Sequence, residues 1–138
     1  MQKEINQVWF FKQSPEEVWK FLTLPELLEQ WLGKTDFRPT VGHKFHFISP
    51  HNNHAQCEVL EVKPFARLSY SWQKRSLKDD RPYDSKVAWT LTPKGEGTEL
   101  QLVHNGFIAL EDQSGHDNGW KGCIKKCKDL MNQTQSVK

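Results

Sequence analysis

His104 is the residue whose type and position in this sequence offer the most chemistry. Leu100 and Leu102 point to one face of a predicted strand, and His104 continues that face where another apolar residue is expected. A histidine on a buried face needs a hydrogen-bond partner, which can be a carboxylate or a bound ligand. His104 therefore has three possible roles: a hydrogen-bonded core residue, a ligand contact or an acid–base catalyst.

Four further histidines occur close together in the sequence: His43, His46, His51 and His54. A structural metal site needs several such nitrogens at about 2.0–2.1 Å from one ion. Residues three positions apart on a regular strand point to opposite faces, which separates His43 from His46. We therefore interpret these histidines as parts of a solvated hairpin around a turn at residues 50–53, and we predict no metal site.

Cys123 and Cys127 lie four positions apart, which places two thiols on one face of a predicted helix. A thiol pair can bind a metal or act as a redox couple, but the C-x-x-C spacing typical of such sites is absent. We interpret both residues as small core side chains. Because the sequence also has no Ser-His-Asp order, no acidic dyad and no phosphate-binding loop, we predict no cofactor and a function that is not enzymatic.

The aromatic residues form the second candidate for a site. They make up 12% of the chain, with six Trp and eight Phe. Rings in such number either pack together as a core or line a cavity for an apolar ligand. We predict these ligand-binding residues: Trp31, Phe45, Phe47, Tyr70, Trp72, Trp89, His104 and Trp120. Tyr70 and His104 would orient a polar end of the ligand, and the sequence leaves open whether the rings fill the cavity.

The elements that position these residues follow from the periodicity of the sequence. Residues 5–11 predict a strand, and Ser14 with Pro15 signals the first of two short helices. Five or six antiparallel strands follow, and a helical stripe of apolar residues runs from Trp120. The strand at residues 55–63 has two candidate inward faces, and Gly106 is expected to end the last strand. The polar residues 73–86 predict an exposed hairpin loop or a mobile lid.

Composition narrows the class of protein. A chain of 138 residues suits a single domain over residues 1–138, and its net charge of +2 argues against nucleic-acid binding. No apolar run approaches the roughly 18 residues of a membrane span, and no signal peptide is recognisable. Three cysteines without framework spacing suit a reducing compartment. We therefore expect a cytoplasmic protein that binds neither nucleic acid nor membrane.

Two groups of residues resemble a known family. They are Ser14–Trp19, Thr23–Leu27 and Trp31 in the first half, and Gly97–Leu100, Leu102, His104, Gly106–Phe107 and Gly119–Trp120 in the second. This pattern resembles the START-like (SRPBCC) superfamily, in the branch related to the C-terminal domain of the activator of heat-shock-protein-ninety ATPase. The resemblance implies an α+β helix-grip fold, in which a curved antiparallel sheet wraps around a long C-terminal helix, with two short helices after strand one. The chain departs from many relatives at Gly42–His43, where they carry two glycines.

The same resemblance implies three classes of function: binders of hydrophobic small molecules, co-chaperone modules, and occasional enzymes such as aromatase/cyclases. We predict the first, non-enzymatic binding of a small hydrophobic or aromatic ligand in a central cavity. The alternative is a chaperone-linked interaction module, which we expect less because the N-terminal domain of those co-chaperones is not among these residues. The third is a cyclase- or hydrolase-type enzyme that uses His104, for which no second catalytic group is evident.

Overall fold

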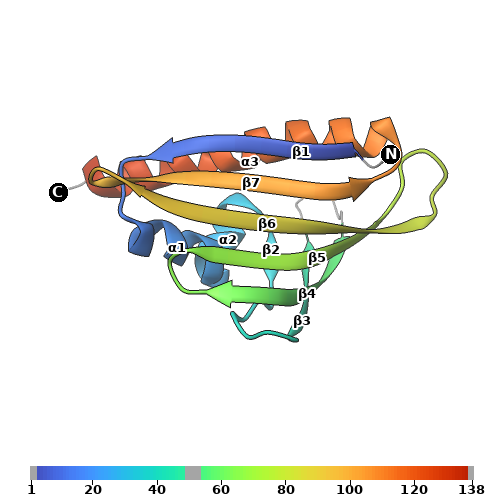
Figure 1. Cartoon of the computed structure of the whole chain (residues 1–138), viewed down its shortest axis with the longest axis horizontal. Helices are drawn as coiled ribbons and strands as arrows, with labels where there is room; N and C mark the ends of the chain where they lie inside the picture. The colour runs from blue at the N-terminus through green and yellow to red at the C-terminus, as the bar shows by residue number, and fades with distance from the viewer. Residues whose placement is uncertain (1–2, 49–53, 137–138) are drawn as a thin grey trace.

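The computed structural model describes residues 3–48 and 54–136, with side chains up to residue 133. Alternation of apolar and polar residues gives most strands one buried face, and the strands assemble into a curved sheet (Figure 1). The strands are β1 (Lys3–Phe11), β2 (Lys34–Thr35), β3 (Lys44–Ile48), β4 (His54–Lys63), β5 (Arg67–Arg75), β6 (Pro82–Lys94) and β7 (Gly97–Phe107). They form one antiparallel sheet in the order β1-β7-β6-β5-β4-β3-β2. The predicted turn at residues 50–53, with His51, lies outside the described residues.

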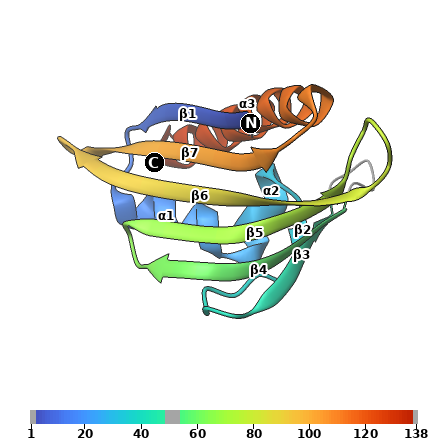
Figure 2. The same ribbon diagram turned by 45° about the vertical axis from the view of Figure 1, so that its right-hand side comes forward.

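The helices are α1 (Pro15–Thr23), α2 (Pro25–Trp31) and α3 (Leu110–Ser136). Ser14 Oγ accepts a hydrogen bond from the Glu17 amide at 3.4 Å and Pro15 opens α1, as the sequence predicts. Figure 1 shows α3 running along β1 and β7, and the turned view of Figure 2 shows α1 and α2 under the middle of the sheet. This arrangement confirms the predicted α+β helix-grip fold. No helix in the described ranges is both long and apolar enough to cross a membrane.

The polar segment predicted as a loop over residues 73–86 is mostly strand, so that prediction is wrong. β5 continues to Arg75 and β6 begins at Pro82, which leaves a loop of residues 76–81 only. The sequence is polar there because the hairpin extends beyond the core, and even its inward residues Lys74 and Tyr83 are only half-buried. The inner end of this hairpin therefore carries polar side chains toward α3.

β4 alternates poorly because it contains a β-bulge. Val59 pairs with Tyr70 and Glu61 pairs with Ser69, so that Leu60 is an extra residue in β4. Cys57 and Val59 point into the core, whereas Leu60 is exposed. The bulge shifts the phase of the strand, which explains why a single face could not be assigned from the pattern.

β7 also differs from the prediction, since it continues through Gly106 to Phe107. Gly106 has φ +108°, and a Cβ built there would lie 2.9 Å from Ser85 Cα. The glycine therefore allows close approach of β6 and β7 at this point instead of ending the strand.

Candidate functional site

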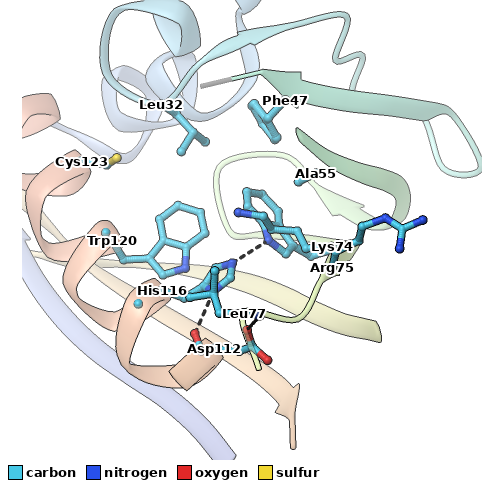
Figure 3. A pocket seen from close by; sticks show the side chains of 13 residues that line it. Leu32, Phe47, Ala55, Lys74, Arg75, Leu77, Asp112, His116, Trp120 and Cys123 are labelled. Atoms are coloured by element: carbon cyan, nitrogen blue, oxygen red, sulfur yellow. Dashed lines mark hydrogen bonds between the residues drawn. The ribbon is translucent and has the colours of Figure 1, made fainter. Parts of the chain in front are cut away.

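A cleft of about 300 Å³ lies between the sheet and the first half of α3. Figure 3 shows its walls, which come from β3, β4, β5, the β5–β6 loop, α3 and the residue after α2. The apolar lining residues are Leu32, Phe47, Ala55, Trp72, Leu77, Trp120 and Cys123. The polar lining residues are Lys74, Arg75, Asp112 and His116. Because Arg75 and the neighbouring Leu77 are exposed, the polar end is the end nearer solvent.

Two glycines of α3, Gly115 and Gly119, form part of the cleft wall. A Cβ at Gly119 would meet no atom within 4 Å, and a Cβ at Gly115 would meet only Leu77 Cδ1, at 3.5 Å. Close packing therefore does not require glycine at either position, and glycine inside a helix costs about 1 kcal/mol relative to alanine. The missing side chains leave open space on the helix face that borders the cleft.

His104 lies completely buried behind the cleft wall. Trp120 Nε1 donates a hydrogen bond to His104 Nδ1 at 3.0 Å, and because an indole N–H can only donate, the neutral imidazole carries its proton on Nε2. This Nε2 lies 2.8 Å from Ser85 Oγ, which in turn donates to the carbonyl oxygen of Trp72 at 2.8 Å. Burial lowers the pKa of His104 to about 2. His104 is thus a hydrogen-bonded core residue, and neither ring nitrogen is free for a ligand or for proton transfer.

His116, one turn before Trp120 on α3, forms a second chain of hydrogen bonds. Trp72 Nε1 donates to His116 Nε2 at 3.2 Å, and His116 Nδ1 donates to the carbonyl oxygen of Asp112 at 2.9 Å. Burial lowers the pKa of His116 to about 4, so this ring is neutral near pH 7. The indole N–H groups of Trp72 and Trp120 are therefore both hydrogen-bonded to histidines. A ligand in the cleft can contact only the apolar parts of these two rings.

Asp112 joins the first turn of α3 to the β5–β6 loop. Its Oδ2 accepts a hydrogen bond from Ser76 Oγ at 2.5 Å, and its Oδ1 accepts one from the Leu77 amide at 2.7 Å. The residue is 3% exposed, so these two bonds replace the hydration that a buried carboxylate loses. The loop of residues 76–81, part of the segment predicted as an exposed hairpin loop or a mobile lid, is therefore anchored at its first two residues.

Lys74 lies on the inward face of β5, two residues after Trp72, and it is partly buried. Figure 3 shows Lys74 extending into the cleft, whereas Arg75 points away from it. Among the described residues, no hydrogen bond or ion pair to Lys74 is formed. Burial lowers the pKa of Lys74, and the charge of Asp112 opposes this shift.

The structure separates the predicted ligand-binding residues into two sets. Phe47, Trp72 and Trp120 line the cleft. The remaining members, which lie outside this cleft wall, are Trp31, Phe45, Tyr70, Trp89 and His104. Their rings fill the space between sheet and helices by edge-to-face packing, with centroids 6.2 Å apart for Trp31–Trp89 and 5.3 Å apart for Phe45–Tyr70. Phe45 also borders a second, more open hollow of about 430 Å³ among polar side chains of β3 and β4.

Tyr70 and Trp89 lie close together on the paired strands β5 and β6. Trp89 Nε1 donates to the Tyr70 hydroxyl at 2.9 Å, and both residues are almost completely buried. Burial raises the pKa of the Tyr70 hydroxyl above its usual range. This hydroxyl therefore serves the packed core and lies away from the cleft, which corrects its expected place beside a ligand.

The histidines near β3 and the cysteines show ordinary structural contacts. His43 Nε2 hydrogen-bonds the carbonyl oxygen of Asp36 at 2.9 Å, and His46 Nδ1 lies 3.5 Å from Asp36 Oδ1. Within residues 3–48 and 54–136, no three His, Cys, Asp or Glu side chains are grouped to hold a metal ion. Cys123 and Cys127 are free thiols, and burial raises the pKa of Cys127 to about 12.

Sequence reasoning missed the polar end of the cleft. For Lys74 a signal was present, because the alternation of Leu68, Tyr70 and Trp72 places it on the same inward face. Asp112 and His116 stand four positions apart, which puts them on one face of a helix. That signal could be used only if the helix was known to begin at Leu110 and not near the apolar stripe.

Several solved structures share this architecture. The crystal structure of MLL2253 from Mesorhizobium loti is 34% identical, with a TM-score of 0.89, and the match covers 96% of this chain and 98% of that chain. CalU16 from Micromonospora echinospora is 22% identical, with a TM-score of 0.76 and 98% and 83% coverage. The Aha1 dimer from Colwellia psychrerythraea is 18% identical, with a TM-score of 0.77 and 92% and 94% coverage. The last two similarities support the fold alone.

Sequence comparison identifies the family more directly. No curated protein matches the chain. The sequence model of the family described as Activator of Hsp90 ATPase homolog 1-like protein matches residues 12–132. This match, together with the 34% identity to MLL2253 over nearly the whole chain, confirms the resemblance stated from the two residue groups. The chain belongs to the Activator of Hsp90 ATPase homolog 1-like family.

Proposed function

We propose that the protein binds a small apolar or aromatic ligand in the cleft between the sheet and α3, without catalysing a reaction. The observation that carries this proposal is the apolar wall of Phe47, Trp72 and Trp120 facing the space left by Gly115 and Gly119. Ligand sites in proteins are concave and mainly apolar, with few polar groups. A ring placed against these side chains would be removed from water at about 25 cal/mol per Å² of buried apolar surface.

The polar groups beside the cleft favour binding over catalysis. A general acid or base must exchange a proton near the working pH, but His104 and His116 both have pKa values far below 7 and both ring nitrogens engaged. Burial also raises the pKa of the Cys123 thiol, which keeps it protonated and a weak nucleophile. These groups stabilise the wall and hold its rings in fixed orientations.

The test uses 1-naphthaleneacetamide, a neutral two-ring probe, and follows the indole N–H resonances of ¹⁵N-labelled protein. We expect the resonances of Trp72 and Trp120 to shift on titration, while that of Trp19, outside the cleft wall, stays in place. Saturable shifts confined to the cleft tryptophans would support the proposal. Absence of binding, or shifts that avoid Trp72 and Trp120, would contradict it.

Two glycine substitutions in α3 give a matched pair of variants. Gly119→Leu adds a side chain that projects from the cleft wall, and its Cβ meets no atom within 4 Å. Gly122→Leu adds the same side chain on the same helix, again with no Cβ contact within 4 Å, but outside the cleft wall. Both changes should stabilise the helix by a similar amount. We expect Gly119→Leu to weaken probe binding at least about tenfold and Gly122→Leu to leave it unchanged.

A second candidate function is the chaperone-linked interaction that the name of the family suggests. It rests on the family match alone, and no described surface points to a chaperone. The measurement is the ATPase rate of the cognate heat-shock chaperone with and without this protein. Stimulation that persists in Gly119→Leu would assign this function to a surface separate from the cleft.

A further inference from the structure

We infer that the ligand of the cleft is an organic acid, with an apolar ring system against Trp72 and Trp120 and a carboxylate group paired with Lys74. This inference rests on the proposed function and deepens it, because it names the chemical class of the ligand. The placement of Lys74 carries it: the ammonium-bearing chain extends into the cleft from the strand position that follows Trp72 on the inward face.

The ammonium group of Lys74 is unpaired in a partly buried place. Some cations of the described chain have carboxylate partners, such as Arg67 with Glu61 at 3.0 Å and Lys121 with Asp117 at 3.1 Å, and exposed lysines without one, such as Lys86, are hydrated instead. Asp112 is the acidic residue among those that line the cleft, but both of its oxygens accept hydrogen bonds from the β5–β6 loop and it forms no ion pair with Lys74. A partly buried ammonium group without a hydrogen bond or ion pair has lost part of its hydration, so a ligand carboxylate would recover free energy there.

A second polar group without a partner lies on the same face. Tyr83 on β6 is the register partner of Lys74, so the two side chains project to the same side of the sheet. The Tyr83 hydroxyl is buried and has no hydrogen-bond partner within the described residues. Buried hydroxyl groups are normally paired, and although Tyr83 does not line the cleft, its unpaired hydroxyl adds a polar group to the face that Lys74 shares.

The remaining groups of the cleft fix the direction in which such a ligand lies. The indole N–H groups of Trp72 and Trp120 are occupied by histidines, and His116 is neutral with both nitrogens engaged. Arg75 points away and bonds the carbonyl oxygen of Asp80 at 2.7 Å. The buried end of the cleft therefore offers apolar contact. At the polar end, Lys74 is the cation that extends into the cleft, and the Asp112 carboxylate beside it is engaged by the β5–β6 loop.

The test compares two probes of the same shape, 1-naphthaleneacetate and 1-naphthaleneacetamide, by calorimetric titration at pH 7.5. We expect the wild-type protein to bind the acetate at least about tenfold more tightly, as a charge-assisted hydrogen bond in a partly buried site implies. Lys74→Met removes the charge and keeps the apolar stem, so it should abolish this preference and change amide affinity by less than about threefold.

Lys86→Met is the control, because Lys86 is an exposed residue of β6 on the opposite face and its loss changes the net charge equally. It should retain the preference for the acetate. Equal binding of both probes to the wild type, an unchanged preference in Lys74→Met, or the same loss in Lys86→Met would overturn the inference while the proposed function stands. Binding of neither probe would overturn both. The comparison of the two probes on the wild type needs no variant, so it remains decisive if Lys74→Met folds poorly.

Discussion

We expect the free energy of unfolding to decrease as the pH falls below 7, because two buried histidines are neutral in the folded protein. His104 and His116 have an ordinary pKa of 6.5, which the folded protein lowers to about 2 and about 4 respectively, chiefly through burial. Below pH 6.5 the unfolded chain therefore binds protons that the folded chain does not bind. The free energy of unfolding then rises with pH, and the stability present above pH 6.5 is lost as the pH falls toward the folded values.

The size of this change in the free energy of unfolding follows from the difference between the pKa of each histidine in the unfolded and in the folded chain. For one histidine with these pKa values, the change between pH 7.5 and pH 5.0 is up to about 2 kcal/mol, at about 1.4 kcal/mol per pH unit in the steepest part. The two histidines together give up to about 4 kcal/mol. That is a large fraction of the 5–15 kcal/mol, roughly, by which single domains are stable.

The assay is urea unfolding followed by tryptophan fluorescence at pH 7.5 and pH 5.0. His116→Gln keeps a donor and an acceptor at the cleft but cannot be protonated, so it should lose up to about 2 kcal/mol less than the wild type over this interval. Carboxylates titrate equally in both proteins and cancel in the comparison. If the wild type and His116→Gln lose the same stability, the neutral, buried state assigned to His116 is wrong.

Three further outcomes follow from the packing. Trp89→Ala should lower the free energy of unfolding by about 3–5 kcal/mol in urea titrations, because Trp89 is 1% exposed in the filled core; a loss below 1 kcal/mol would mean that it borders open space. Asp112→Asn should speed hydrogen exchange at the Leu77 amide at least about tenfold, since the charged acceptor is lost, and an unchanged rate would contradict the anchoring. Limited trypsin digestion should cut first at Lys78 in the exposed loop, since the other basic residue of the loop, Arg81, is followed by Pro82 and trypsin does not cleave before proline; first cleavage within β5 would contradict the paired hairpin.

The sequence predicted most of the strands and the start of α1, because each of these rests on local periodicity or on a capping signal. Ser14 and Pro15 fix a helix start by hydrogen bonding and by φ, whatever the rest of the chain does. The bulge at Leu60 was invisible because it depends on pairing with β5, which a single strand does not encode. The sequence identified the large aromatic residues of the interior. Whether a given ring fills the core or lines a cleft depends on distances between strands and helices, which a sequence pattern does not contain.

The polar end of the cleft escaped prediction for a different reason, which also explains how the cleft can exist. The first half of α3 contains Ser114, Gly115, Asn118 and Gly119, all weak helix formers, so its periodicity is poor. Tertiary bonds support it instead: Gln113 donates to the Glu4 carbonyl at 2.9 Å and Gln7 donates to Asp117 Oδ1 at 2.9 Å. The glycines that obscure the helix in the sequence are the same residues that leave room beside Trp120. A substitution that makes this segment an obvious helix, such as Gly119→Leu, would on this reasoning stabilise the protein and close its site.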